Sequence, residues 1–240
     1  MPVLETVNIV KQYKKRRVVD GISLKVETGR VVGMLGPNGA GKTTSFYMIA
    51  GFIRPDEGSV LLNGEEITGL PIHLRALKGI SYLAQDSSVF KKLTVEENVR
   101  IVLEPLGLSA KKIKERIEQL FSELKIGYLA DNKAHSLSGG ERRRVEIMRA
   151  LATNPQFILL DEPFAGIDPL AVADLQQIIS DLRKRGLGVL ISDHNVRETL
   201  AVCDHAYIVS NGQILTDGPA EEIVNSDEAR RMYLGENFSM

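Results

Sequence analysis

The chain contains a glycine-rich segment whose spacing suits a bound phosphate group. Gly36-Pro-Asn-Gly-Ala-Gly-Lys-Thr43 fits the pattern G-x-x-x-x-G-K-[ST] and lies between the apolar run Val31 to Leu35 and a helix-like stretch. Glycines let backbone N–H groups curl around the phosphates, lysine supplies a compact positive charge, and the threonine hydroxyl can bind Mg²⁺. The segment therefore predicts a nucleoside triphosphate site. Its predicted contacts are Gly36, Asn38, Gly39, Gly41, Lys42, Thr43 and Thr44.

Two adjacent carboxylates end a second apolar run, Phe157-Ile-Leu-Leu-Asp-Glu162. On a buried parallel strand, the carboxyl end is where ligands of open α/β sheets bind. Successive strand residues point to opposite sides, so the two acids should have different roles. We assign Asp161 to the Mg²⁺ shell and Glu162 to the general base that polarises the water attacking the γ-phosphate. The alternative is an exposed acidic turn before Pro163.

A second glycine-rich segment, Ser138-Gly-Gly-Glu141, begins a predicted helix. Ser138 and Glu141 form a capping box that would begin any helix, and Val145 and Met148 continue one apolar stripe. A cap does not require two glycines, whereas Gly139 and Gly140 would let a phosphate approach bare backbone amides closely. Because the first loop should already hold one side of the triphosphate, this second site would serve a nucleotide held by another copy. The predicted assembly is a head-to-tail homodimer with two nucleotides.

Composition sets the class of protein. The 240 residues are 43% hydrophobic and 25% charged, as expected for a globular domain. The formal net charge of -1 gives no overall field that would attract nucleic acid, and the basic clusters at 14–17 and 111–116 are interpreted as solvated faces. A single cysteine, Cys203, and an N-terminus without an apolar leader favour the cytoplasm. No run reaches the roughly 20 apolar residues of a spanning helix, so membrane contact is expected only through partners.

Strand-like and helix-like segments alternate around these motifs. Residues 3–85 are mostly strand-like, with a hairpin predicted at Asn63-Gly64. Residues 86–135 instead carry apolar residues at helical spacing, which predicts an inserted helical subdomain. The apolar positions are Ile113, Ile117, Leu120, Phe121 and Leu124.

The second half of the chain predicts a parallel sheet. A helix from Gly139 is followed by the strand 157–162, a helix over 169–185, a strand over 188–194 and a helix from Val196. A hairpin turning at Asn211-Gly212 comes next, and the segment 220–240 reads as one or two short helices and a tail. We predict one α/β domain over residues 1–240, with a mainly parallel core sheet covered on both faces.

Taken together, the phosphate loop, "LSGGE", "FILLDE" and the later "ISDHN" resemble the ATP-binding cassette (ABC) ATPases in order and spacing, over essentially the whole chain. The resemblance implies the P-loop NTPase fold of that family, with an N-terminal antiparallel β subdomain and the helical subdomain inserted. It also implies that Ser138, Gly139 and Gly140 act on the nucleotide of the partner copy. The implied cofactors are ATP and Mg²⁺, and the implied reaction is ATP hydrolysis.

The resemblance gives roles to residues that mean little alone. It implies that Tyr13 stacks on adenine, that Gln85 contacts Mg²⁺ or the attacking water, and that His194 contacts the γ-phosphate. Asp168 matches the aspartate of the loop at the dimer interface. For Tyr13 the alternative is an ordinary strand tyrosine at a sheet edge. His73, His135 and His205 lack metal-ligand spacing and are interpreted as structural.

Two segments depart from the common family pattern. Glu141 stands where glutamine is commoner, and we expect this to be tolerated because either residue completes the capping box. The loop after Glu162 reads Pro-Phe-Ala-Gly-Ile-Asp168, where many members carry Pro-Thr-Ser-Ala-Leu-Asp. The lost hydroxyl puts side-chain contacts from this loop across the dimer in doubt.

ABC ATPases serve transport, DNA repair or translation. The insert 86–135 has no sustained heptads, unlike the long coiled coil of repair members, and the chain holds one cassette rather than two. Transport is therefore favoured, with a groove near Phe90 predicted to receive membrane permease subunits. For Phe90 the alternative is a core aromatic residue of the insert.

Several longer segments resemble the lipopolysaccharide-export group of the family: "KTTSFYMIAG", "LSGGERRRVEIMRALA", "DEPFAGIDP", "LISDHNVRETLAVCDHAYIVS" and "YLGENF". This resemblance implies a peripheral subunit on the cytoplasmic face of an inner membrane, which drives lipopolysaccharide extraction. The alternatives are the ATPase of a branched-chain amino-acid importer and a soluble ATP-dependent switch.

Overall fold

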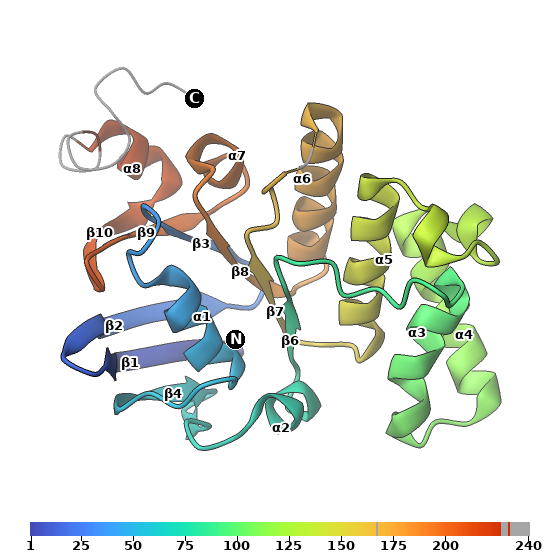
Figure 1. The fold of residues 1–240 in the computed structure, drawn as a ribbon, viewed down its shortest axis with the longest axis horizontal. Helices are drawn as coiled ribbons and strands as arrows, with labels where there is room; N and C mark the ends of the chain where they lie inside the picture. The colour runs from blue at the N-terminus through green and yellow to red at the C-terminus, as the bar shows by residue number, and fades with distance from the viewer. Residues whose placement is uncertain (167, 227–229, 231–240) are drawn as a thin grey trace.

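The computed structural model describes residues 1–166, 168–226 and 230, and these residues form two β-sheets (Figure 1). The first sheet is antiparallel, in the order β2-β1-β4-β5. Its strands are β1 (Val3–Tyr13), β2 (Arg16–Glu27), β4 (Glu57–Leu62) and β5 (Glu65–Glu66). The second sheet has the order β10-β9-β3-β8-β7-β6 and is parallel except for β10 against β9. Its strands are β3 (Val31–Leu35), β6 (Ile80–Leu83), β7 (Phe157–Asp161), β8 (Gly188–Asp193), β9 (His205–Ser210) and β10 (Gln213–Pro219).

Both predicted hairpins form where an Asn-Gly pair separates two apolar runs. Asn63 and Gly64 connect β4 to β5 with φ angles of 55° and 79°, and Asn211 and Gly212 connect β9 to β10 with 49° and 82°. Two successive positive φ angles suit a tight hairpin turn, and asparagine and glycine adopt them at low cost. These predictions are confirmed.

The central strands are buried on both faces, and their side chains divide between two hydrophobic clusters. On β7, Ile158 and Leu160 join the cluster shared with α5 and α6, whereas Phe157 and Leu159 join the cluster shared with α1 and the antiparallel sheet. This alternation follows from the two-residue period of a strand. Every residue of β3, β7 and β8 is buried, as expected for parallel strands covered by helices. The predicted α/β class with a mainly parallel core sheet is confirmed.

Helices cover both faces of the central sheet, and α3 and α4 pack beside α5 at one side of the molecule (Figure 1). The helices are α1 (Lys42–Ala50), α2 (Ile72–Leu77), α3 (Val95–Leu103), α4 (Ala110–Leu124), α5 (Gly139–Ala152), α6 (Pro169–Lys184), α7 (Val196–Leu200) and α8 (Ala220–Asn225). Short 3₁₀ turns occupy Glu104–Leu106, Gly127–Leu129 and Ala134–Ser136. Helix α8 accounts for the first part of the predicted segment 220–240, and residues 227–229 and 231–240 lie outside the described residues.

All five apolar residues that predicted a helix in the insert are buried on α4. Ser109 begins this helix by accepting a hydrogen bond from the Lys112 N–H. Helix α3 begins with a full capping box, in which Thr94 and Glu97 bond to each other's backbone N–H groups. The amphipathic pattern therefore places α4 correctly.

The structure differs from the sequence-based expectations at Arg116 and at the short helix α2. Arg116 is not part of a solvated face, because its guanidinium donates to the carbonyls of Leu151 and Ala152 at the end of α5. The segment 3–85 also contains the short helix α2, which lacks enough turns to show a period. Its Arg75 is fully buried and donates to carbonyls of α1 and of the chain before α2, including those of Met48 and Thr68.

Candidate functional site

The candidate site lies where three parallel strands end. The phosphate loop follows β3, Glu162 follows β7, and His194 follows β8. Strands β3, β8 and β7 are neighbours with parallel register, so their carboxyl ends meet at one edge of the sheet. Ligands of open α/β sheets bind at this edge.

The phosphate loop leads directly into α1, with Gly41 at its N-cap. Gly41 has φ 104°, and a Cβ there would lie 2.5 Å from the Val18 carbonyl oxygen, so only glycine fits. The loop lines a cavity of about 120 Å³. Its lining residues are Val18, Asn38, Gly39, Gly41, Lys42, Thr43, Thr44 and Glu162.

Lys42 is almost fully buried inside this loop. Its Nζ donates to the carbonyl oxygens of Gly36 at 2.7 Å and Pro37 at 3.1 Å. Burial lowers the Lys42 pKa, and the nearby carboxylates, led by Glu162, act in the opposite direction. A desolvated cation in a loop of backbone N–H groups suits a phosphate anion.

Asp161 ends β7 and is 2% exposed. Its Oδ2 accepts a hydrogen bond from the Tyr82 hydroxyl at 3.1 Å, whereas its buried Oδ1 has no hydrogen-bond partner in the part of the chain that the structure describes. Burial raises the pKa of the Asp161 carboxyl, with the Glu162 and Asp193 charges adding to the effect. A buried carboxylate oxygen left without a donor is a fitting ligand for a hard cation such as Mg²⁺.

Glu162 brings the predicted catalytic residues together. Gln85 Nε2 donates to Glu162 Oε2 at 2.9 Å, and His194 Nδ1 lies 3.3 Å from the same oxygen. The backbone of Glu162 is left-handed, with φ 42°, and its N–H donates to the Ser192 carbonyl at 2.7 Å. Such a conformation costs energy for a residue with a Cβ and is typical of functional sites.

Asp193 supports this cluster, although the sequence reasoning missed it. It is fully buried, and its Oδ1 accepts hydrogen bonds from the N–H groups of His194 and Asn195. Its Oδ2 accepts the Phe164 N–H at 3.1 Å. Burial raises the Asp193 pKa, and these backbone hydrogen bonds oppose that effect. The Asp193 carboxylate thus bonds to both the His194 segment and the loop after Glu162. The sequence signal that could have indicated this residue is its place at the end of a predicted strand, directly before His194.

The Ser138 segment begins α5 with the predicted capping box. Ser138 Oγ and N–H both donate to Glu141 Oε2, at 2.7 and 2.8 Å, and these bonds lower the Glu141 pKa. Gly139 lines a separate cavity of about 230 Å³ that also includes Gln85 and Glu162 but none of the residues 36–44. In the part of the chain that the structure describes, Gly139 and the phosphate loop therefore line different cavities.

Two other predicted residues lie at the edges of the site. Tyr13 ends β1 with its ring half exposed, and Lys11 Nζ lies 5.9 Å from the ring centroid. Tyr13 does not line the phosphate-loop cavity. Asp168 lies directly before α6, where its Oδ1 accepts the Ala171 N–H at 3.0 Å. Ile167, which precedes Asp168 in the loop after Glu162, lies outside the described residues.

Phe90 lies on the surface, with 46% of its area exposed. The buried Asn98 of α3 holds the Phe90 backbone, accepting its N–H at 2.8 Å and donating to its carbonyl at 3.1 Å. The Arg149 guanidinium of α5 lies 4.9 Å from the ring centroid. Phe90 is therefore not a core aromatic residue, and Asn98 is a supporting residue that the sequence reasoning missed.

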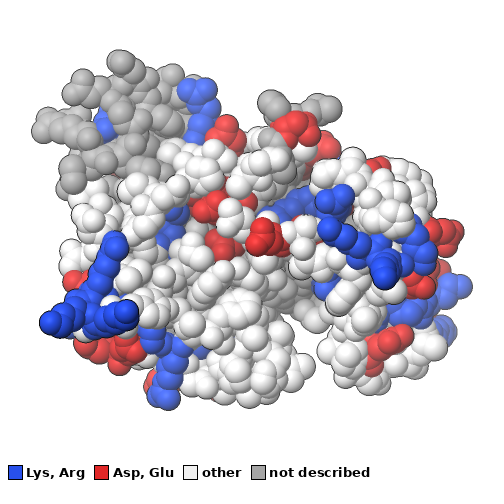
Figure 2. Space-filling view, in the orientation of Figure 1, with Lys and Arg blue, Asp and Glu red and all other residues white. Residues whose placement is uncertain are grey.

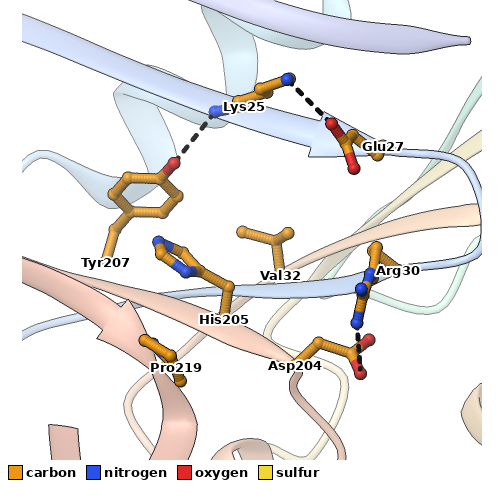
Figure 3. Close-up of a pocket in the computed structure, with 8 residues that line it drawn as sticks. All are labelled: Lys25, Glu27, Arg30, Val32, Asp204, His205, Tyr207 and Pro219. Carbon is orange, nitrogen blue, oxygen red and sulfur yellow. Dashed lines mark hydrogen bonds and ion pairs between the residues drawn. The ribbon is translucent and has the colours of Figure 1, made fainter. Parts of the chain in front are cut away.

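A larger pocket, of about 350 Å³, opens at the amino ends of β3 and β9 (Figure 3). Its charged side chains pair with one another, Lys25 with Glu27 at 2.8 Å and Arg30 with Asp204 at 3.6 Å. The Tyr207 hydroxyl accepts the Lys25 N–H at 3.2 Å. This pocket lies at the opposite end of the strands from the phosphate loop, so it is not the candidate nucleotide site.

The face seen in Figure 2 carries interspersed acidic and basic side chains, with basic side chains gathered toward the right, where the helical part lies in Figure 1. Across the described residues, no helix has the combined length and apolar character needed to cross a bilayer. The same residues hold no cluster of three or more His, Cys, Asp or Glu side chains suited to a metal ion.

Comparison with known proteins agrees with this geometry. The sequence model of the ABC transporter family matches residues 19–165. The chain is 54% identical, over the full length of both chains, to the lipopolysaccharide export system ATP-binding protein LptB of Haemophilus influenzae, and 53% identical over full length to the LptB of Escherichia coli K12. A solved ATP-binding cassette of an ABC transporter, in its ADP conformation, has 34% identity and a TM-score of 0.88 over 98% of this chain and 100% of that one. By this full-length similarity and by the family match, the chain belongs to the ABC transporter family.

Proposed function

We propose that this chain is the ATP-hydrolysing subunit of a transporter that extracts lipopolysaccharide from an inner membrane for export. The observation that carries the catalytic part is the contact of Gln85 and His194 with one oxygen of Glu162, beside the Lys42 loop. The cargo is supported by the full-length identity with relatives named as lipopolysaccharide export ATPases.

In the proposed reaction, the phosphate loop and Lys42 bind the β- and γ-phosphates, and Tyr13 stacks on the adenine. Glu162 takes a proton from the attacking water, Gln85 orients that water, and His194 contacts the γ-phosphate. Thr43, Asp161 and Gln85 would hold Mg²⁺, with the orphaned Asp161 Oδ1 the best-suited ligand. When bound, this ion neutralises negative charge on the phosphates.

The second half of the site would come from another copy of the chain. Ser138, Gly139 and Gly140 begin a long helix, and Gly139 lines a different cavity from the described phosphate loop of its own chain. A head-to-tail dimer would place these residues of one copy against the nucleotide of the other and enclose two ATP molecules. ATP would favour the closed dimer because it contacts both copies only in that state.

Membrane attachment would run through partner permease subunits. Phe90 and the segment 87–93 form the proposed docking surface, because Phe90 is exposed while Asn98 and Arg149 fix its position. Gln85 lies two residues before this segment and contacts Glu162, so a partner bound here would be linked to the proposed catalytic residues. The chain would therefore lie on the cytoplasmic face of the membrane, without entering the bilayer.

The test is to isolate the chain from detergent-solubilised native membranes and identify the subunits that remain bound. We expect lipopolysaccharide-export permease subunits, and we expect Phe90→Ala to lose them. Lys114→Ala, on the exposed face of α4, is the control that should retain them. Recovery of amino-acid permease subunits would instead indicate an importer, and recovery of soluble partners alone would contradict a role in transport.

A further inference from the structure

Glu162 lines two separate cavities and is the one lining residue that they share. The first is the phosphate-loop cavity, and the second is the cavity of about 230 Å³ described above, here named the arginine cavity. The lining residues of the arginine cavity are Gln85, Ser87, Gly139, Arg142, Arg143, Glu146, Glu162, Pro163, Ala165 and Gly166. A group leaving the phosphate loop past Glu162 would therefore enter this second space within the same chain.

The arginine cavity has guanidinium groups with unused hydrogen-bond donors. The Arg143 side chain is only 11% exposed, and its Nη1 bonds to the Ala84 carbonyl at 3.1 Å and to Glu146 Oε2 at 3.0 Å. Among the described residues, its Nε and Nη2 have no hydrogen-bond partner, and neither does the Nε of Arg142. Unsatisfied buried donors cost free energy, and guanidinium groups match the oxygens of a phosphate. A phosphate that draws these side chains toward it would satisfy donors that the chain itself leaves unpaired.

The two carboxylates of the cavity do not exclude an anion. Glu146 already bonds to Arg143 and accepts the Ser88 N–H at 3.1 Å, so its charge is compensated. Glu162 Oε2 likewise has partners, because it accepts Gln85 Nε2 at 2.9 Å and lies 3.3 Å from His194 Nδ1.

We propose that the arginine cavity binds inorganic phosphate and is the route by which the cleaved γ-phosphate leaves while the dimer is closed. In the proposed dimer, the partner's Ser138-Gly139-Gly140 segment closes the other side of the nucleotide, so a route within the chain lets the product leave before the dimer opens. This inference rests on the proposed ATP hydrolysis. Arg143 would be the main phosphate contact, with Arg142 assisting.

The first test measures binding without any catalysis. Inorganic phosphate is titrated into the full-length chain with ADP bound, and binding is followed by ³¹P nuclear magnetic resonance. We expect Arg143→Gln to weaken phosphate binding about tenfold, as for one lost charge-assisted contact, and Arg143→Lys to restore part of it. Arg144→Gln, which removes an arginine of the same helix that contacts Leu124 and Asp174 instead, should bind like wild type. Equal binding by all four proteins would overturn the proposal.

The second test separates cleavage from release in a single turnover. Quenched-flow measurement gives the rate of ATP cleavage, and a fluorescent phosphate sensor gives the rate of release. Ser87→Trp fills the cavity from an exposed position, and we expect it to slow release about tenfold relative to cleavage, with unfolding temperature unchanged. Release that keeps pace with cleavage in both Ser87→Trp and Arg143→Gln would overturn the route. Absence of cleavage in wild type would contradict the proposed function instead, and the binding test would still decide the site.

Discussion

At the scale of single residues, the proposed hydrolysis depends on Glu162. One of its carboxylate oxygens contacts both Gln85 and His194. Glu162→Gln keeps the size and the hydrogen-bonding ability of the side chain but removes its basicity. We expect turnover to fall by about 10²- to 10⁴-fold, as for loss of a general base, with little change in ATP affinity. Steady-state hydrolysis and nucleotide binding measure both quantities. Glu118→Gln, on the exposed face of α4, is the control, and unchanged turnover of Glu162→Gln would remove Glu162 from this role.

Asp161 carries a second prediction, which concerns stability and pH. Burial raises its pKa above 3.8, so between 3.8 and the raised value the folded state binds more protons than the unfolded state. Its stabilising contribution is therefore present at low pH and is lost as pH rises through the folded pKa. Without Mg²⁺ at pH 8, we expect Asp161→Asn to raise the free energy of unfolding by about 1–3 kcal/mol, because it removes a buried, half-unsatisfied charge.

Thermal unfolding across pH 4–8 measures this effect. The gap between wild type and Asp161→Asn should close toward the acidic end of the range, where the wild-type carboxyl is protonated. Mg²⁺ with ATP should stabilise wild type far more than the variant. An Asp161→Asn protein that is less stable than wild type at pH 8 without Mg²⁺ would contradict this interpretation of the buried carboxylate.

The sequence alone pointed to the residues proposed to act on the nucleotide, but not to the residues that contact and support them. Short contiguous sequence patterns identify Lys42, Asp161 and Glu162, and the residue types in each pattern are enough to indicate its chemistry. Tyr82 is not in such a pattern, because its effect depends on a contact across strands, from β6 to an acid on β7. Asp193 stands within "ISDHN", but the sequence does not show its contact with the Phe164 N–H. Single polar residues at strand ends are common, and their partners become visible only in three dimensions.

At the scale of elements, α3 and α5 together hold the proposed docking surface. Asn98 of α3 is buried and bonds to four backbone groups of residues 90–94, including the Thr94 carbonyl at 2.8 Å. Arg149 and Glu146 of α5 bond to the carbonyl and the N–H of Ser88. Helix α5 also begins with the Ser138 segment, so one rigid element contacts the docking surface and presents the residues proposed to meet the partner's nucleotide.

Asn98→Ala tests whether this support matters, because it leaves Phe90 itself intact. The substitution leaves backbone groups around Phe90 without partners, each costing about 1–3 kcal/mol if they stay buried. We expect faster hydrogen exchange in residues 87–94 and loss of permease subunits on purification, with ATP binding by the isolated chain retained. Lys114→Ala is again the control. If Asn98→Ala retained the permease subunits and showed normal hydrogen exchange in residues 87–94, this segment would not need Asn98 to hold its conformation.

The periodic elements were predictable and the short ones were not. Helix α4 buries each of its five apolar residues, because a long amphipathic repeat reports directly on the buried face. Helix α2 is too short for a period, and its fully buried Arg75 is a residue type that normally indicates a surface. The prediction that Arg116 lies on a solvated face was wrong because arginine normally indicates a surface. Its guanidinium instead donates to carbonyls at the end of α5, a contact between two helices that the basic residues near it in the sequence do not indicate.

At the scale of the whole molecule, the phosphate loop and the Ser138 segment are presented by different parts of one chain. The loop lies at the carboxyl edge of the central sheet, and the Ser138 segment begins α5 beside the helical part (Figure 1). Each is a partial anion site, and the two line different cavities. In the proposed head-to-tail dimer, a second copy would complete both sites at once, which would explain why one chain carries two glycine-rich segments.

The most direct test of a nucleotide shared between two copies is the mass of Glu162→Gln in solution, with and without saturating Mg²⁺ and ATP, by size-exclusion chromatography with light scattering. Because we expect this variant to bind ATP and to hydrolyse it far more slowly, we predict a shift from the 26.5 kDa monomer to twice that mass when ATP is present. Adding Ser138→Arg should abolish the shift and leave ATP binding to the monomer intact. A monomer at saturating ATP and high protein concentration, or a dimer indifferent to Ser138→Arg, would contradict a nucleotide clamped between two copies.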